Sequence, residues 1–275
     1  MPTPFKFFVA GCQRSGTTML RLVLDSHPDI RCFDEAVAYE FLTGRHPEVL
    51  DVAGVAAIGF KIPRFSEQLG WPQQIDPDYG RFSSFYHGEK TLFIVRDVCD
   101  VVSSMVSLKA DASATWIERY AVNILRAILP EYPGGELLNE KFAELEARDF
   151  PRHLLGALYW EAKNQGLLSM LAGGGAVLPI SYEAFVKSPR ADLERVMQFL
   201  GLPWSDALLM HHQHEHQELD ERGLAIGNTD PKRAIDGNSV GKAALCLTGR
   251  ECDEILAFVE STRREITALG IGHDL

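Results

Sequence analysis

Long hydrophobic runs are absent from this sequence of 275 residues, and so are internal repeats and low-complexity linkers. The longest apolar runs are too short to cross a bilayer, which argues against a membrane span. The first residues lead directly into an apolar segment and leave no room for a signal peptide, so we expect a cytoplasmic protein. Because no domain boundary is visible, we expect one domain over residues 1–275.

Basic residues are outnumbered, with 27 Lys and Arg against 38 Asp and Glu and a net charge of −11. This balance argues against a nucleic-acid partner, because nucleic acids repel acidic surfaces. The apolar content of 46% and the charged content of 24% are those of an ordinary globular protein.

Cysteine is also scarce, and its five positions form neither a Cys-x-x-Cys pair nor a zinc-binding spacing. We therefore expect the cysteines to be packed as small apolar side chains in a reducing compartment. Their positions are Cys12, Cys32, Cys99, Cys246 and Cys252.

Four short apolar segments, at 5–10, 57–61, 91–95 and 176–180, have the composition of strands, and helical patterns lie between them. This order predicts an α/β fold with a mostly parallel sheet flanked by helices. Residues 108–160 read as a mostly helical insertion over the sheet, interrupted by a Pro- and Gly-rich stretch at 130–135. Residues 248–269 read as a terminal helix.

The segment that follows the first predicted strand contains a turn rich in Gly, Ser and Thr, and a helical pattern begins directly after it. Unpaired backbone amides at such a helix start favour a bound phosphate. An ordinary turn with a Ser or Thr cap is the alternative. No Lys follows Gly16, as it would in the loop that binds nucleoside triphosphates, so a kinase or NTPase is disfavoured.

The run from Arg14 to Glu35, RSGTTMLRLVLDSHPDIRCFDE, resembles the sulfotransferases that use 3′-phosphoadenosine-5′-phosphosulfate (PAPS). It is closest to the protein-tyrosine sulfotransferase branch. The resemblance implies the P-loop-like sulfotransferase fold, with the insertion at about 108–160 on the acceptor side. It covers most of the chain in order and is weak across residues 105–175. It also implies a loop that holds the 5′-phosphosulfate through Arg14, Ser15, Gly16, Thr17 and Thr18.

Three residues match family positions near the reacting atoms. Glu35 falls where the family has its general base, with a helix-capping role as the alternative and Asp34 as the more natural cap. Lys61 resembles the lysine that contacts the oxygen between phosphate and sulfate, and a solvated strand-end lysine is the alternative. Asn228 lies near the position of a family serine that shares this contact, so the chain departs from the family there.

Arg96 and Ser104 stand eight residues apart, which is the family spacing for the residues that hold the 3′-phosphate. Val98 replaces the common proline of this motif. Tyr182 matches a position that packs on the adenosine, although an aromatic residue there also suits a core.

The polar stretch 228–242 resembles the late loop that closes on the nucleotide. In this stretch Arg233 and Lys242 are candidate phosphate contacts, unless it is a solvated surface loop. Arg64 is a weaker anion-binding candidate. The histidines of 211–216 are interpreted as a solvated helix or an acceptor-facing lid. A metal site is the alternative, since His212 and His216 would be one helical turn apart.

We therefore expect sulfuryl transfer from PAPS, with 3′-phosphoadenosine-5′-phosphate (PAP) as product and no metal, by in-line displacement onto a hydroxyl acceptor. The alternatives are a P-loop phosphotransferase and a non-catalytic protein that binds PAPS or PAP. The acceptor stays open among peptide tyrosine, carbohydrate, lipid and small metabolite, partly because Val37 stands where the branch has an arginine. A homodimer also stays open. Secreted-pathway relatives join a cysteine matching Cys32 to one near the lysine, and here no cysteine lies near Lys61.

Overall fold

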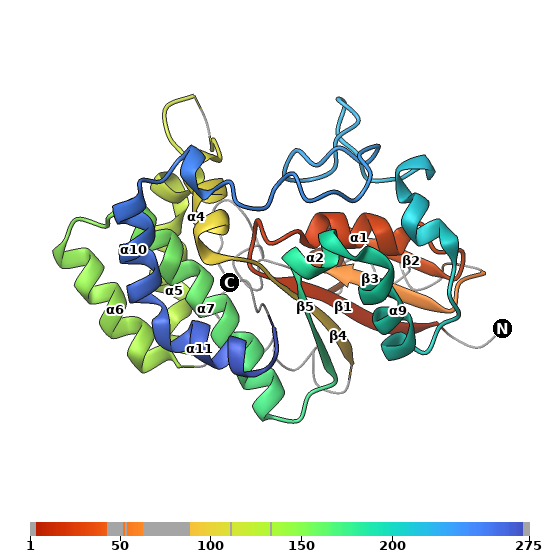
Figure 1. The fold of residues 1–275 in the computed structure, drawn as a ribbon, viewed down its shortest axis with the longest axis horizontal. Coiled ribbons are helices and arrows are strands. Elements are labelled where there is room, and N and C mark those ends of the chain that lie inside the picture. The colour runs from red at the N-terminus through yellow and green to blue at the C-terminus, as the bar shows by residue number, and fades with distance from the viewer. Residues whose placement is uncertain are drawn as a thin grey trace.

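The computed structural model describes residues 4–42, 52, 54–62, 89–110, 112–132 and 134–271. Its centre is a sheet of five parallel strands in the order β2-β3-β1-β4-β5, so the first strand lies in the middle (Figure 1). The strands are β1 (Phe5–Gly11), β2 (Ile30–Phe33), β3 (Ala57–Lys61), β4 (Lys90–Val95) and β5 (Val177–Ser181).

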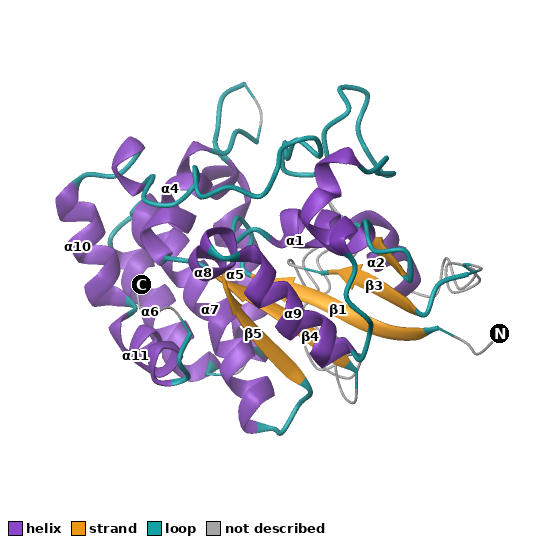
Figure 2. Cartoon of the chain, turned by 45° about the vertical axis from the view of Figure 1, so that its right-hand side comes forward, coloured by secondary structure: helices purple, strands orange, loops and turns teal. Residues whose placement is uncertain are grey.

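Helices cover both faces of this sheet, and a group of them extends beyond one end of it (Figures 1 and 2). That group contains α4, α5, α6, α7, α10 and α11, whereas α1, α8 and α9 lie with the strands. The α-helices are α1 (Thr17–Asp25), α2 (Glu35–Leu42), α4 (Val98–Ser107), α5 (Val122–Ile128), α6 (Gly135–Ala147), α7 (Arg152–Ala172), α8 (Tyr182–Lys187), α9 (Pro189–Leu200), α10 (Gly249–Phe258) and α11 (Glu260–Ala268). The shorter turns are the π-helix η3 (Ile117–Ala121) and the 3₁₀-helices η4 (Leu129–Glu131), η5 (Asp206–Gln213) and η6 (Ala243–Leu245).

The alternation of side chains along β1 divides the core between the two faces. Phe8 and Ala10 belong to a cluster that includes buried residues of α4 and α7. Phe7 and Val9 belong to a second cluster, formed with residues of α1, α8 and α9. A strand buried on both faces must be apolar almost throughout, which explains why the start of the chain reads as a continuous hydrophobic run.

The predicted α/β class is confirmed, and the four predicted strands lie within one residue of β1, β3, β4 and β5. The sequence analysis missed β2, which has only four residues and includes Arg31. The predicted terminal helix is two helices, because the backbone of Val259 turns to φ −107° and ψ 16° between α10 and α11.

The segment 108–160 is mostly helical, as predicted, but its last helix has a wider role than an insertion. The helix α7 continues to Ala172 and packs against α4 and β1. The prediction of a single domain stays a prediction.

No helix in the described ranges is long and apolar enough to span a membrane.

All five cysteines have free thiols, and the expected packing as small apolar side chains holds for three of them. Cys12, Cys32 and Cys99 are buried, whereas Cys252 is half-buried and Cys246 is exposed.

Candidate active site

The turn after β1 is held in a conformation that few residue types adopt easily. Gly11 has φ 145°, and a Cβ atom there would lie 2.4 Å from the carbonyl oxygen of Ile94. Arg14 and Gly16 have φ values of 69° and 95°, and α1 begins directly after them. Ser15 is fully buried, and its hydroxyl has no hydrogen-bond partner within the described chain. The loop therefore keeps a buried donor available at the start of a helix.

Arg14 connects this loop to two distant parts of the chain. Its Nε donates to the hydroxyl of Ser104 at 2.8 Å, and its Nη1 donates to the carbonyl of Gly227 at 3.1 Å. The Arg14 carbonyl accepts a hydrogen bond from Arg96 Nη1 at 2.9 Å. Burial, and next the charge of Arg96, lower the pKa of the Arg14 guanidinium. Two cations held this close together favour an anion between or beside them.

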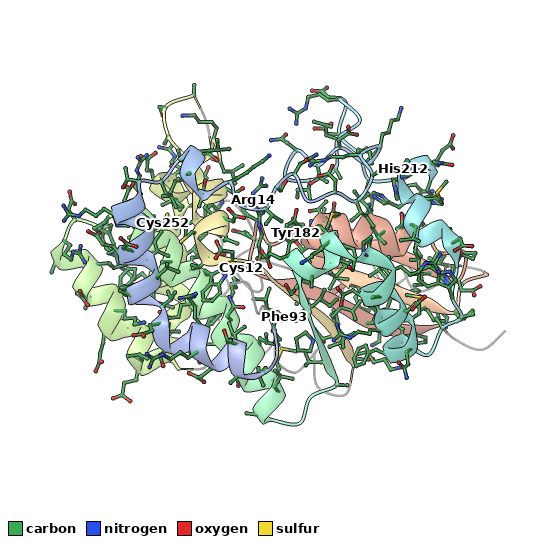
Figure 3. The ribbon with its side chains drawn as sticks, viewed as in Figure 1. Cys12, Arg14, Phe93, Tyr182, His212 and Cys252 are labelled. Atoms are coloured by element: carbon green, nitrogen blue, oxygen red, sulfur yellow. The ribbon has the colours of Figure 1, made fainter. Side chains whose placement is uncertain are left out.

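Arg96, directly after β4, is 7% exposed, and its guanidinium carbon lies 4.6 Å from the ring centroid of Tyr182. Arg96 also pairs with Asp100 at 3.4 Å, while its Nε has no hydrogen-bond partner within the described chain. The Tyr182 ring covers Gly16, where a Cβ atom would lie 2.6 Å from the ring. Arg14 and Tyr182 thus lie close together, between the helical group and the sheet (Figure 3).

A first pocket, of about 270 Å³, opens beside these residues. Its walls come from the loop, from the ends of β4 and β5, and from the late segment 227–239. The lining residues include Arg14, Gly16, Thr17, Thr18, Arg96, Tyr182, His211, Gly227, Asn228 and Arg233. The pocket therefore combines cations, hydroxyls and the phenol ring of Tyr182 with the carboxylates of Asp230 and Asp236, and its cations suit an anionic nucleotide.

A second pocket, of about 200 Å³, adjoins the first. The two pockets share one wall, made of Arg14, Thr17, Thr18 and Gly227. The remaining residues of the second pocket are Gln13, Glu35, Lys61, Leu108, Trp116 and Ile226. Groups bound in the two pockets would therefore meet at the start of α1.

Lys61 is 1% exposed at the end of β3, so the interpretation as a solvated lysine is wrong. Its Nζ donates to Thr18 Oγ1 at 2.9 Å and to Asp34 Oδ1 at 2.8 Å. Glu35 Oε1 lies 3.1 Å from the same Nζ. Burial on its own would raise the pKa of Asp34, but the charge of Lys61, its hydrogen bond and Arg21 outweigh burial and lower that pKa. The carboxylates of Asp34 and Glu35 thus hold Lys61 at the shared wall.

The other predicted residues differ in whether they line one of these pockets. The Ser104 hydroxyl accepts a hydrogen bond from Arg14 and lines neither pocket. Asn228 has φ 58° and lines the first pocket, whereas Lys61 lines the second. The side-chain oxygen of Asn228 accepts a hydrogen bond from Arg222 at 2.7 Å.

Arg233 lines the first pocket and is paired with Asp236, whose pKa that hydrogen bond lowers to about 2. Lys242 is exposed and does not line either pocket, and Arg64 lies outside the described residues.

The histidine segment differs from the predicted solvated helix. The 3₁₀-helix η5 ends at Gln213, so His212 and His216 are not one helical turn apart. His211 is 1% exposed and lines the first pocket. Burial, followed by the charges of His216 and His212, lowers its pKa to about 4.

Two functional features escaped the sequence analysis. Asp100 accepts hydrogen bonds from the amides of Gly241 and Ala243, both at 2.8 Å, and so fastens to α4 the residues that directly follow the late segment. Trp116 forms part of the second pocket. An aspartate one helical turn after Arg96 was a local signal for the first feature, whereas the position of Trp116 depends on tertiary packing alone.

Residues 4–71 match the model of the sulfotransferase family. A putative protein-tyrosine sulfotransferase of Caenorhabditis briggsae is 24% identical over 92% of this chain and 86% of the relative. Protein-tyrosine sulfotransferase 2 of Gallus gallus is 26% identical over 75% of this chain. The chain spans only 53% of that relative and 64% of protein-tyrosine sulfotransferase 1 of Danio rerio.

Solved structures show the same fold. A sulfotransferase domain from the curacin biosynthetic pathway matches with a TM-score of 0.60 and 16% identity over 94% of this chain and 99% of that domain. A mouse sulfotransferase complexed with PAP matches with a TM-score of 0.53 and 15% identity, over 94% of this chain and 85% of that one. Residues 4–71 and these relatives thus show that the chain is similar to sulfotransferases.

Proposed function

We propose that the protein transfers a sulfuryl group from PAPS to a hydroxyl acceptor by in-line displacement. The observation that carries the proposal is the pair of adjoining pockets with a common wall of Arg14, Thr17, Thr18 and Gly227. One pocket has the donors that an anionic nucleotide needs, and the other contains a buried carboxylate and a buried lysine. This division separates a donor side from an acceptor side.

The first pocket fits PAPS. Arg96 lines this pocket, and its Nε is a buried donor without a hydrogen-bond partner within the described chain. The Ser15 hydroxyl, in the adjoining loop, is buried and unpartnered there as well, and a bound phosphate would satisfy such groups. We assign the 5′ end to the loop from Arg14 to Thr18 and the 3′-phosphate to Arg96 and Ser104. The assignment of Ser104 requires Arg14 to release its hydroxyl. The Tyr182 ring lies at this pocket, where it can face the adenine.

In the second pocket, Glu35 accepts the proton of the acceptor hydroxyl as that hydroxyl attacks. PAPS, when bound, supplies the sulfuryl group and a leaving phosphate that gains negative charge. Lys61 stabilises this charge, because its ammonium is already fixed at Thr18 on the shared wall. Asn228 keeps a donating amide at the first pocket, where it can assist Lys61 only by a change of position.

The acceptor side combines this polar pair with the apolar side chains of Leu108, Trp116 and Ile226. It therefore suits a hydroxyl on an aromatic or apolar group, such as the tyrosine after which several relatives are named. The donor set of both pockets binds anions, so we propose that transfer needs no metal. Free thiols at all five cysteines fit the cytoplasmic location predicted from the sequence.

Two comparisons test the donor assignment. We expect calorimetry to show tight binding of PAP and weak binding of ATP. We expect Arg96→Ala to weaken PAP binding roughly 100-fold, since charge-assisted hydrogen bonds are lost. The control is Arg250→Ala, an exposed arginine on α10 that pairs with Glu254. Tighter binding of ATP than of PAP would favour the phosphotransferase. Equal affinities of Arg96→Ala and Arg250→Ala for PAP would refute the assignment of the donor site.

The transfer itself is tested with isotope-labelled PAPS. The purified protein is incubated with a panel of phenols, tyrosine peptides, sugars and alcohols, and with an extract of the native host. Mass spectrometry then identifies labelled products. Tight PAP binding without any labelled product would favour the non-catalytic binding protein.

A further inference from the structure

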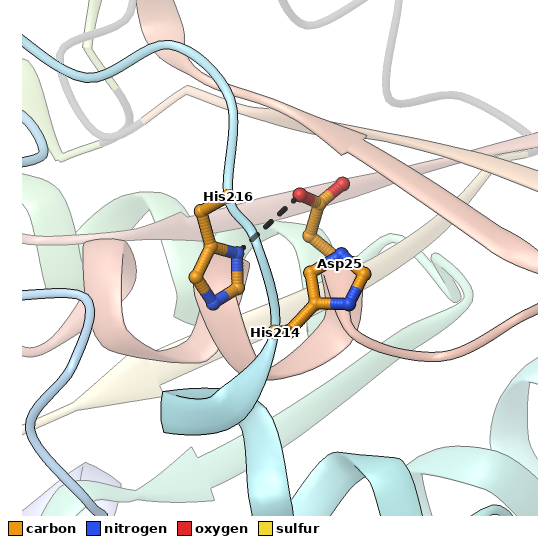
Figure 4. A group of neighbouring side chains, drawn as sticks. All are labelled: Asp25, His214 and His216. Atoms are coloured by element: carbon orange, nitrogen blue, oxygen red, sulfur yellow. Dashed lines mark ion pairs between the residues drawn. The ribbon is translucent and has the colours of Figure 1, made fainter.

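We propose that Asp25, His214 and His216 bind one zinc ion at the end of α1, apart from both pockets. Asp25 is the last residue of α1, and the two histidines follow η5 (Figure 4). One ligand atom from each residue lies within 4.8 Å of the others. The site differs from the His212 and His216 pair considered from the sequence.

The distance between His216 and Asp25 is close to that in a tetrahedral zinc site, whereas His214 would have to move closer. His216 Nδ1 lies 3.6 Å from Asp25 Oδ2, the contact drawn as a dashed line in Figure 4. Two ligand atoms bound to one zinc at about 2.0–2.2 Å are separated by roughly 3.3–3.6 Å. The rings of His214 and His216 have centroids 5.0 Å apart and are inclined by 65°, so both can turn a nitrogen toward one point.

The hydrogen bonding of His216 determines which ring nitrogen can bind a metal. Its Nε2 lies 3.0 Å from the His211 carbonyl oxygen and therefore carries the hydrogen of that bond. Its side chain has 0% exposure, and Nδ1 has no hydrogen-bond partner within the described chain. In the neutral ring, Nδ1 thus directs a lone pair toward a carboxylate, which is unfavourable unless a cation lies between them. A metal-bound histidine usually donates the N–H of its other ring nitrogen to a carboxylate, a backbone carbonyl or a water molecule.

Asp25 has one lone-pair position left for a metal. Its Oδ1 accepts hydrogen bonds from the Cys32 amide at 2.9 Å and from Arg31 at 2.8 Å. Its Oδ2 accepts a hydrogen bond from Arg31 at 2.9 Å and faces His216. The charges of Arg31 and of the buried Arg21 oppose a metal, and Glu218, which pairs with both arginines, offsets part of that charge.

The remaining ligand, His214, is exposed, so a water molecule can complete four-coordination. Two histidines and a carboxylate are a ligand set that zinc accepts. The ion would fasten the segment after η5 to α1. That segment continues into 227–239, which lines the first pocket, so the metal would fix one end of the cover over the nucleotide.

Metal binding is tested on the full chain after chelation, without any activity assay. We expect zinc calorimetry to show one site per chain, and Co²⁺ titration to give the visible absorption of a tetrahedral complex. His214→Ala should weaken zinc binding by at least about 100-fold, since even supporting residues of zinc sites are worth up to this factor. His214 is exposed, so this variant leaves the core intact.

The matched control is His212→Ala, which removes a neighbouring histidine outside the group and should keep the affinity of the original protein. His216→Gln gives a second ligand variant and should bind as weakly as His214→Ala. No binding to the original protein would mean that a proton, rather than a metal, lies between His216 and Asp25, and would overturn the proposal. Equal affinities in His214→Ala and the original protein would overturn it as well. Neither result bears on sulfuryl transfer, which is measured separately.

Discussion

Arg14 lines both pockets and connects the segments that form them. Its side chain joins α4 through Ser104 and the late segment through Gly227, and its carbonyl accepts from Arg96. Glycine at 227 suits this contact, because a Cβ atom would lie 2.9 Å from Arg14 Nη1 and the backbone has φ 75°. The sequence indicated Arg14 through the loop pattern, but Gly227 could be recognised only from the tertiary contact.

Glu35→Gln tests the base at this scale. We expect PAP binding close to that of the original protein, because Glu35 lies in the second pocket and not in the first. Transfer should fall by about 10²–10⁴-fold, since an amide cannot accept the proton. Calorimetry and a labelled-PAPS assay measure the two quantities. Normal turnover in this variant would reassign the base.

Gly16→Ala tests the contact between the loop and Tyr182. A methyl group would lie 2.6 Å from the ring, in addition to the strain of alanine at φ 95°. We expect a lower melting temperature and weaker PAP binding. Gly174→Ala is the control, because it has φ 71° with no atom within 4 Å and so carries only the backbone strain, about 1–2 kcal/mol. Equal melting temperatures in the two variants would show that Tyr182 simply moves aside.

Among the elements, α4 links the chemistry of the site to the stability of the fold. Asp97 caps it by accepting from the Asp100 amide at 2.9 Å, and Asp100 in turn holds the residues that directly follow the late segment. Burial raises the pKa of Asp97. When folding raises the pKa of a carboxyl, the free energy of unfolding falls as pH rises from the pKa of the unfolded state to that of the folded state. In this pH range only the unfolded chain loses the proton easily.

Asp97→Asn should therefore stabilise the protein at pH 7. Asparagine keeps the cap but carries no charge. The difference in free energy of unfolding between Asp97→Asn and the original protein should be small near about pH 3.5, where Asp97 is largely protonated in both the folded and the unfolded chain. It should grow toward neutral pH. Urea unfolding at several pH values measures it. Asp97→Ala, which loses the cap, should be less stable than the asparagine variant at every pH, and a pH-independent difference for asparagine would contradict the assignment.

The elements also show how far sequence patterns extend. The strands β1, β3, β4 and β5 were predictable, because a strand buried on both faces is apolar and bounded by turns. The positions of Arg14, Lys61 and Arg96 were predictable because each lies at or just after the end of such a strand, where the site of a parallel sheet is expected. The position of Lys242 was not, because the stretch 228–242 has no repeating pattern that would fix its side chains. The burial of His211 and His216 depends on how η5 packs on α1, which no local pattern records.

At the scale of the whole molecule, the site lies between parts of the chain that are distant in sequence, and PAP should hold them together. We expect PAP to slow hydrogen exchange of the amides in 227–239, which line the first pocket. The helix α6, in the outer helical group, should exchange at the same rate with and without PAP (Figure 1). Slower exchange in α6 alone would place the nucleotide elsewhere.

The central place of β1 has a consequence for how the protein is made. Among the described strands β1 leaves the ribosome first, yet its partners are β3, at 57–61, and β4, at 90–95. This hydrophobic strand has both edges open until residue 61 has emerged and one edge open until residue 95 has emerged, and parallel pairing forms slowly. Nascent chains of this protein should therefore gain more from chaperones and from slow, cool expression than chains whose first strand closes a hairpin.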